Sequence, residues 1–248
     1  MTKTEDYRRQ LLALSDWTPF LLKESGLPGP RGNLELAQVF ADEASLSQIE
    51  EFLSIPPRRA PENSPQVFLI FCGLTALGKR IAHGELQQLK RLRTYASDPR
   101  WRVREAVAIA LQYVGDSSMK SLLQSLRTWR AGNWYEKRAV AAALAEPRLL
   151  KVSSSALEVL RILDAFTSDI ASAHDARNES FKVLRQTMGY AWSVAVVAAP
   201  TAGKTFMEKW CRSSDPNVLW IMKENLKKSR LTRMDAKWVR RLRSALQR

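Results

Sequence analysis

The chain has 248 residues, of which 45% are hydrophobic, with only 10 Gly and 11 Pro. This composition excludes wholesale disorder, and the low Gly and Pro content leaves room for long helices, so we expect an all-α protein. The net charge of +14 indicates an anionic partner such as nucleic acid, a membrane surface or an acidic protein, unless it serves solubility alone.

The cysteines and the apolar runs indicate the cellular compartment in which the protein is expected. Cys72 and Cys211 are the only cysteines, which excludes a disulfide framework and fits a reducing compartment. The most apolar runs, 67–77 and 191–199, are shorter than the roughly 20 residues of a transmembrane helix. Because the N-terminal residues also lack an apolar signal core, we expect a cytoplasmic protein with no membrane span.

The first third of the chain, residues 1–82, is expected to form an N-terminal helical cap and an irregular repeat. Gly and Pro cluster in 26–32 and break the helical pattern there, and Asn33 follows as a candidate N-cap. The apolar spacing predicts helices over 5–14, from Thr18-Pro19 to the break, and over 34–42, 46–53 and 66–81.

From residue 83 onward, pairs of helices repeat. The pairs are expected at 85–95 with 99–114, 119–129 with 134–144, 156–167 with 179–189, and 201–212 with 218–228. Gly115 is expected to break the helix that ends at residue 114, and the apolar stretch 192–199 is expected to intrude between the third and fourth pairs. The Asp98-Pro99 and Asp215-Pro216 turns lie 117 residues apart, which makes three units averaging 39 residues. This period is typical of HEAT and armadillo proteins, so residues 83–248 are expected to form a HEAT-like α-solenoid of stacked antiparallel helix pairs, continuous with 1–82.

Residues 84–115 resemble a standard HEAT repeat, with Asp98 and Arg104 at the spacing of that family's Asp and Arg. The resemblance implies that these two residues form a ladder between neighbouring units. The chain as a whole is similar to a group of uncharacterised bacterial HEAT-repeat proteins through 29–37, 189–196 and 223–228. That similarity implies a fold but no activity.

The second helices also resemble the HEAT-like alkylpurine DNA glycosylases of the bacterial DNA alkylation repair family. The segment from Tyr135 to Arg138 is similar to that family's Trp-x-x-Arg, which implies that Arg138 contacts DNA. The family's catalytic Asp, four positions after a Trp, falls on Glu105 when counted from Trp101. Because Glu stands there instead of Asp, the catalytic residues are unassigned and enzymatic activity is left open.

Aromatic and basic residues recur at equivalent places in two adjacent repeats. Arg and Lys can neutralise phosphates, and aromatic rings can stack on exposed bases. The alternative is that the Trp rings pack between repeats and Arg104 pairs with Asp98. Together with the lysines of the last pair, the candidate nucleic-acid-binding residues are Trp101, Arg102, Arg104, Trp134, Tyr135, Lys137, Arg138, Lys223, Lys227 and Lys228.

The C-terminal segment 230–248 is expected to be a basic amphipathic helix. Met234, Trp238, Leu242 and Ala245 are spaced at i, i+4, i+8 and i+11 and form one apolar stripe. The stripe is expected to pack on the last repeat and leave the arginines outward, although such a helix also suits a membrane surface or a protein partner.

Other patterns are weaker. Residues 198–205 match a relaxed P-loop, but its Lys204 lies between predicted helices without the strand that a P-loop needs. His83 and His174 have no Cys at ligand spacing, so neither a metal nor a cofactor is expected. Asp164, Asp169, Asp175 and Glu179 gather near one connection without a spacing that separates catalysis from helix capping.

The sequence therefore supports three hypotheses. The first is binding of nucleic acid, with duplex DNA expected on a basic concave surface and a link to DNA alkylation repair. The second is excision of alkylated purines by a DNA glycosylase. The third is a scaffold that binds a protein partner, which the extended concave surface of a solenoid suits.

Overall fold

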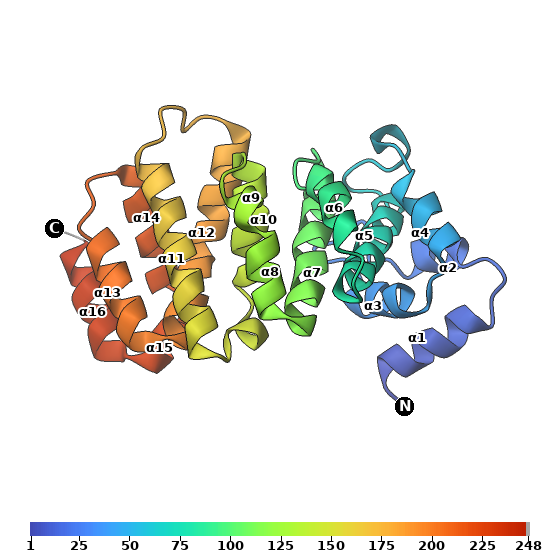
Figure 1. The fold of residues 1–248 in the computed structure, drawn as a ribbon, viewed down its shortest axis with the longest axis horizontal. Coiled ribbons are helices and arrows are strands. Elements are labelled where there is room, and N and C mark those ends of the chain that lie inside the picture. The colour runs from blue at the N-terminus through green and yellow to red at the C-terminus, as the bar shows by residue number, and fades with distance from the viewer. Residues whose placement is uncertain (247–248) are drawn as a thin grey trace. The chain divides into compact units, whose positions relative to one another are not determined.

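The computed structural model describes residues 1–246, which are all-helical: 75% of the chain is helix, in 16 α-helices without a strand in that range. The composition predicted this class. The chain divides into two compact units, Met1–Ser118 and Met119–Arg248, whose helices are labelled in Figure 1. The boundary expected between residues 82 and 83, which separates a cap from a repeat region, stays a prediction.

The first unit is built around α5 (Gln66–Ala82), which packs against α2, α3, α4, α6 and α7. Apart from Lys79 and Arg80, the residues from Val67 to Ile81 are buried, because neighbours cover this helix on nearly every face. The remaining helices of the unit are α1 (Lys3–Leu12), α2 (Thr18–Lys23), α3 (Leu34–Glu43), α4 (Leu46–Leu53), α6 (Leu89–Tyr95) and α7 (Trp101–Ser117), with 3₁₀ turns at Pro57–Arg59 and Leu86–Gln88.

A glycine brings α5 and α7 unusually close together. A Cβ atom on Gly78 would lie 2.4 Å from the Cα of Ala110 in α7, a distance that real side chains do not adopt. The missing side chain therefore allows the two backbones to approach directly. Small residues on both helices set this contact, which is the main long-range contact of the unit.

Helix α7 differs from its prediction at both ends. Its first residue is Trp101, because Asp98 accepts a hydrogen bond from the Arg100 amide and holds the Asp-Pro segment as a turn outside the helix. The free amides of Trp101 and Arg102 donate instead to the carboxylate of Glu62. At the other end the helix continues through Gly115, expected to break it, since Gly115 is buried within the helix.

The second unit is built around α12 (Glu179–Ala198), which packs against α10, α11, α13, α14 and α15. The apolar stretch over 192–199 was expected to interrupt the repeats after residue 189. That expectation is wrong, because residues 192–198 form the second half of a single buried helix and Ala199 is its C-cap. The other helices are α8 (Met119–Ser125), α9 (Arg127–Arg130), α10 (Trp134–Leu144), α11 (Ser153–Ala171), α13 (Pro200–Trp210), α14 (Pro216–Leu226), α15 (Ser229–Met234) and α16 (Ala236–Ala245), with a 3₁₀ turn at Pro147–Leu150.

A fully buried amide, Asn225, joins α14 to α12. Its Nδ2 donates to the Met188 carbonyl at 2.7 Å and to the Ile221 carbonyl at 2.8 Å, and its Oδ1 accepts from the Ser193 amide at 2.8 Å. All three partners are main-chain groups, so the side chain fixes the distance and register between the two helices. Two of the segments that carry the bacterial HEAT-group resemblance, 189–196 and 223–228, meet at this point.

The third segment of that resemblance, 29–37, also has a structural role. Asn33 caps α3 by accepting from the Leu36 amide, and its Nδ2 donates to the Tyr7 hydroxyl and the Glu24 carbonyl, each at 2.8 Å. The predicted N-cap is thus confirmed. Its side chain also ties α1 and the end of α2 to the start of α3.

Candidate nucleic-acid interface

The candidate residues of the first unit, Trp101, Arg102 and Arg104, lie on the first turn of α7. Trp101 is the exposed member, with 39% of its surface accessible, whereas Arg102 and Arg104 are buried at 3% and 7%. The Arg102 guanidinium lies 3.7 Å from the centre of the Trp101 ring. The structure therefore brings these two residues together as a stacked pair.

Arg102 is held by protein oxygens. Its Nη2 donates to the Gly29 carbonyl at 2.9 Å, and its Nη1 pairs with Glu105 at 3.0 Å. The sequence leaves Arg102 without a packing partner, and the structure supplies one 73 residues away in the 26–32 loop. Glu105, at the position implied for a catalytic acid, is half-buried and paired with this arginine.

Arg104 binds main-chain oxygens at the turn before α7. Its Nη1 donates to the carbonyls of Asp98 and Pro99, each at 2.7 Å. The Asp98 carboxylate instead pairs with Arg100, a buried residue that also reaches the Ala60 carbonyl. The turn is therefore fixed by two buried arginines, one of which the sequence did not single out.

In the second unit, Trp134, Tyr135, Lys137 and Arg138 lie on the first turns of α10 and are half-buried. The Trp134 ring packs edge-on against Phe181, with centroids 5.5 Å apart. Lys137 lies over the Trp134 ring and pairs with Asp169 at 2.7 Å. Trp134 and Lys137 thus contact each other, and both have partners inside the unit.

Lys223 and Lys227 line a groove between α14 and α16. They lie one turn apart on α14, and Leu226, Arg243 of α16 and Leu246 complete the lining. The groove has a volume of about 260 Å³, and we refer to these five residues as the C-terminal basic groove. Lys228, the next candidate, precedes α15 and is not among the residues that line the groove.

Charges in the C-terminal basic groove are only partly compensated. Lys227 pairs with Glu224, and Arg243 donates to the Leu226 carbonyl at the end of α14. Lys223 is exposed and has no acidic partner within residues 1–246. A groove with three cations and a single paired carboxylate attracts anions, phosphate groups above all.

The basic amphipathic helix expected over 230–248 packs partly as predicted. Of the four residues of the predicted stripe, Trp238 and Leu242 are buried, Met234 is half-buried at the end of α15, and Ala245 is exposed. The basic side chains of α16 are exposed, as expected: Lys237, Arg240, Arg241 and Arg243. The expected single helix is divided, because Asp235 caps α16 through the Trp238 amide and separates it from α15. Residue 247 and residue 248, which the prediction included, lie outside the described residues.

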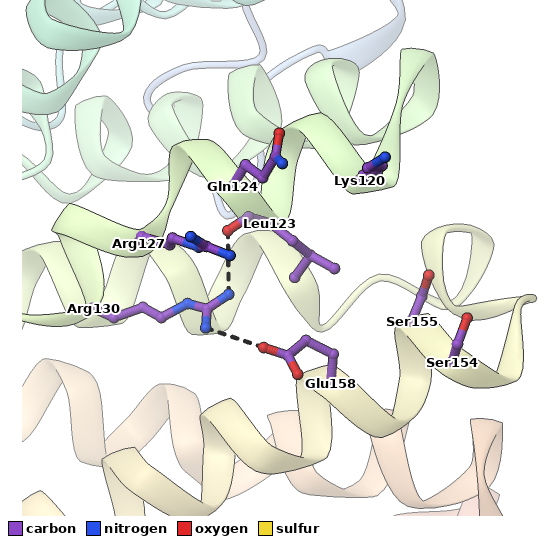
Figure 2. Close-up of a pocket in the computed structure, with 8 residues that line it drawn as sticks. All are labelled: Lys120, Leu123, Gln124, Arg127, Arg130, Ser154, Ser155 and Glu158. Carbon is purple, nitrogen blue, oxygen red and sulfur yellow. Dashed lines mark hydrogen bonds and ion pairs between the residues drawn. The ribbon is translucent and has the colours of Figure 1, made fainter.

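A second pocket, larger than the C-terminal basic groove, was not predicted from the sequence. Its volume is about 510 Å³, and Figure 2 shows it between α8 and α9 on one side and the start of α11 on the other. Lys120, Arg127 and Arg130 contribute three positive charges, and Glu158 contributes one negative charge. The run of three serines at 153–155 and the basic spacing of 120–130 are visible in the sequence, but nothing local indicates that they meet.

The weaker candidates have structural partners. Lys204 of the P-loop pattern lies in α13 and pairs with Asp235 at 2.7 Å. Asp164 accepts from Trp210 and Lys209, and Asp169 binds Lys137, so these acids are engaged in separate contacts. Within residues 1–246, no group of three or more His, Cys, Asp or Glu side chains is placed to hold a metal ion.

The two cysteines are shielded from solvent, Cys72 fully and Cys211 in part. Burial raises the pKa of the Cys72 thiol well above its usual value, and burial together with nearby Glu208 raises the pKa of Cys211 to about 12. Both side chains are free thiols. A raised pKa favours the protonated thiol over the thiolate at neutral pH.

Comparison with known proteins gives no relative: no family model, no curated protein and no solved structure matches this chain. Within residues 1–246, every helix is too short or too polar to cross a membrane.

Proposed function

We propose that the protein binds nucleic acid, with duplex DNA as the ligand, through the exposed cations of its second unit. One observation carries the proposal. The second unit holds 24 Lys and Arg against 11 Asp and Glu, a net charge of +13, whereas the first unit holds 15 against 14, a net charge of +1. The positive charge that attracts a polyanion is therefore concentrated in one unit.

Within that unit, the C-terminal basic groove supplies the phosphate contacts. Lys223 and Lys227 lie on one face of α14 because they are four residues apart, and Arg240 lies one turn before Arg243 on α16. Phosphates along a nucleic-acid backbone are met by such rows of cations. Arg102 and Arg104 take a structural part in the proposal, because both are buried and donate to main-chain carbonyls, whereas the cations of the groove are exposed.

The finer architecture that we propose is the HEAT-like stacking of antiparallel helix pairs. It is supported by the period of about 39 residues and by α11 and α12, which pack on each other as a pair. A crystal structure of the full chain tests it, since successive pairs should stack with all first helices on one side. The scaffold and glycosylase hypotheses stay predictions.

Charge reversal in the groove tests the proposed function. We expect the double variant Lys223→Glu/Lys227→Glu to bind a labelled DNA duplex more weakly than the unaltered chain. The slope of log affinity against log salt should also fall by about 1.8, since each lost phosphate contact removes about 0.9. Fluorescence anisotropy over a salt series measures both quantities.

The matched control is Lys23→Glu/Lys90→Glu, which changes the net charge equally at two exposed lysines of the first unit. This control should have nearly the DNA affinity and salt slope of the unaltered chain. The only expected difference is a small loss of affinity that comes from its lower net charge. Equal losses in both double variants would contradict the groove as the binding site.

A further inference from the structure

The pocket of Figure 2 suggests a second, separate binding function in the same unit. We infer that the α8–α11 pocket, lined by Lys120, Arg127, Arg130, Ser154, Ser155 and Glu158 among others, binds a phosphate monoester. Its volume of about 510 Å³ falls in the range of small-molecule sites, roughly 300–1,000 Å³. The inference does not depend on the proposed function, because different residues carry it.

Charge is the first argument. Lys120 and Arg127 are exposed and have no acidic partner within residues 1–246. Glu158, the one carboxylate of the pocket, already pairs with Arg130 at 3.2 Å and with Arg161 at 3.6 Å. Two uncompensated cations therefore face the cavity, which matches the charge of about −1.5 to −2 on a phosphate monoester at pH 7.

Pre-organisation is the second argument. The Arg130 guanidinium is fixed from two sides, by Glu158 at Nη1 and by the Leu123 carbonyl, 3.2 Å from Nη2 (Figure 2). The Trp129 side chain next to it is buried and anchors α9. The wall between α8 and α9 thus holds its shape without a ligand, which lowers the ordering cost of binding.

Hydrogen-bond donors on the opposite wall are the third argument. Ser154 and Ser155 line the pocket in the first turn of α11, a helix of 19 residues. Val152 at the N-cap provides no side-chain acceptor, and the first turn contains no acidic residue. Serine hydroxyls can donate to phosphate oxygens, and Figure 2 shows Ser154 and Ser155 on the other side of the pocket from Arg127 and Arg130.

The lining residues also predict which part of the ligand contributes little to binding. Leu123 is its one large apolar residue, and none of the lining residues is aromatic. A base would find no ring on which to stack, so the phosphate and not the group attached to it should determine affinity. A free sugar phosphate and the 5′-terminal phosphate of an oligonucleotide share this chemistry.

Calorimetry of the full chain tests the inference. Ribose 5-phosphate should bind and ribose should not. The variant Lys120→Ala/Arg127→Ala should weaken ribose 5-phosphate binding at least about tenfold, because two charge-assisted contacts are lost. Both side chains are exposed and have no ion pair with any of residues 1–246, so the variant should keep its helical circular-dichroism spectrum. Lys23→Ala/Lys90→Ala is the matched control and should bind as the unaltered chain does.

Two further arms separate the sources and the sites. A 5′-phosphorylated oligonucleotide that binds more tightly than its 5′-hydroxyl form, with the gain lost in Lys120→Ala/Arg127→Ala, would support the terminal phosphate as the source. Lys223→Glu/Lys227→Glu should leave ribose 5-phosphate affinity unchanged. Failure of the proposed DNA binding at the groove can therefore be distinguished from failure of phosphate binding at the pocket. No binding at about 10 mM ribose 5-phosphate, or equal affinity in the pocket variant, would overturn the inference.

Discussion

At the scale of single residues, several arginines of this basic chain are buried and stabilise the fold instead of facing solvent. Arg100, Arg102 and Arg104 are each at least nine-tenths buried, and each donates to at least one main-chain carbonyl. A buried guanidinium is tolerated only when its donors are met by acceptors, and here carbonyls and carboxylates meet them. The most basic-looking stretch of the first unit is therefore largely internal.

Residue chemistry also predicts a pH dependence of stability. Lys204 and the Trp238 amide both donate to Asp235, and these hydrogen bonds hold the pKa of Asp235 below its usual value. A lowered folded-state pKa stabilises the fold above the unfolded value of about 3.9, and the contribution is lost as the pH falls through the folded pKa.

Asp235→Asn tests this contribution, since Asn keeps an acceptor for the Trp238 amide but loses the charge. We expect the variant to be less stable than the unaltered chain at pH 7, with the difference shrinking at and below about pH 3.5. Urea unfolding at both pH values measures it. A difference that stays constant or grows on acidification would show that the pair with Lys204 does not contribute.

At the scale of elements, local sequence signals predicted several helix boundaries well. Asn33 caps α3, and α4 and α10 begin and end at the predicted residues. These boundaries depend on neighbours within a few residues, such as a capping side chain and an amide three positions later. The end of α7 and the length of α12 were missed, because packing against other helices overrides the breaking tendency of Gly115 and joins two apolar runs.

Site residues were less predictable than helices because their partners are distant in sequence. Arg102 meets Gly29, and Lys120 shares a pocket with Ser154; neither pairing leaves a periodic signal. The groove lysines could be predicted as a pair from their spacing of four. Arg243 could not be placed opposite them, since the sequence does not fix how α16 crosses α14.

Helix packing gives a sharp prediction for Gly78 in α5. We expect Gly78→Ala to destabilise the protein by about 3 kcal/mol, because its Cβ would overlap the backbone of Ala110, which cannot move without separating α5 from α7. In an unhindered helix the same change would be stabilising by up to about 1 kcal/mol. Thermal or urea unfolding gives the sign and the size.

Gly73→Ala is the control within the same helix. There the new Cβ would lie 3.2 Å from the Leu53 side chain and 3.3 Å from the Phe52 Cβ, compared with 2.4 Å from the Ala110 Cα at Gly78, so the cost should be clearly smaller than at Gly78. If the two variants lost the same stability, the close approach of α5 and α7 would not be the cause.

At the scale of the whole molecule, charge is divided between units that have ordinary apolar interiors. Both units bury their central helices, α5 and α12, so the excess of +13 in the second unit is not required for folding. Self-repulsion of that size opposes compaction slightly, and binding a polyanion relieves it. This asymmetry is the main physical reason to expect a nucleic-acid ligand.

The most direct test of nucleic-acid binding is the salt dependence of duplex DNA affinity for the unaltered chain. Each of the three groove cations releases about 0.9 counterion on binding a phosphate. Log affinity should therefore fall linearly with log salt, with a slope of about −2.7 or steeper. Anisotropy titrations between about 50 and 200 mM salt measure it. No binding at the lowest salt, or an affinity independent of salt, would contradict the proposal.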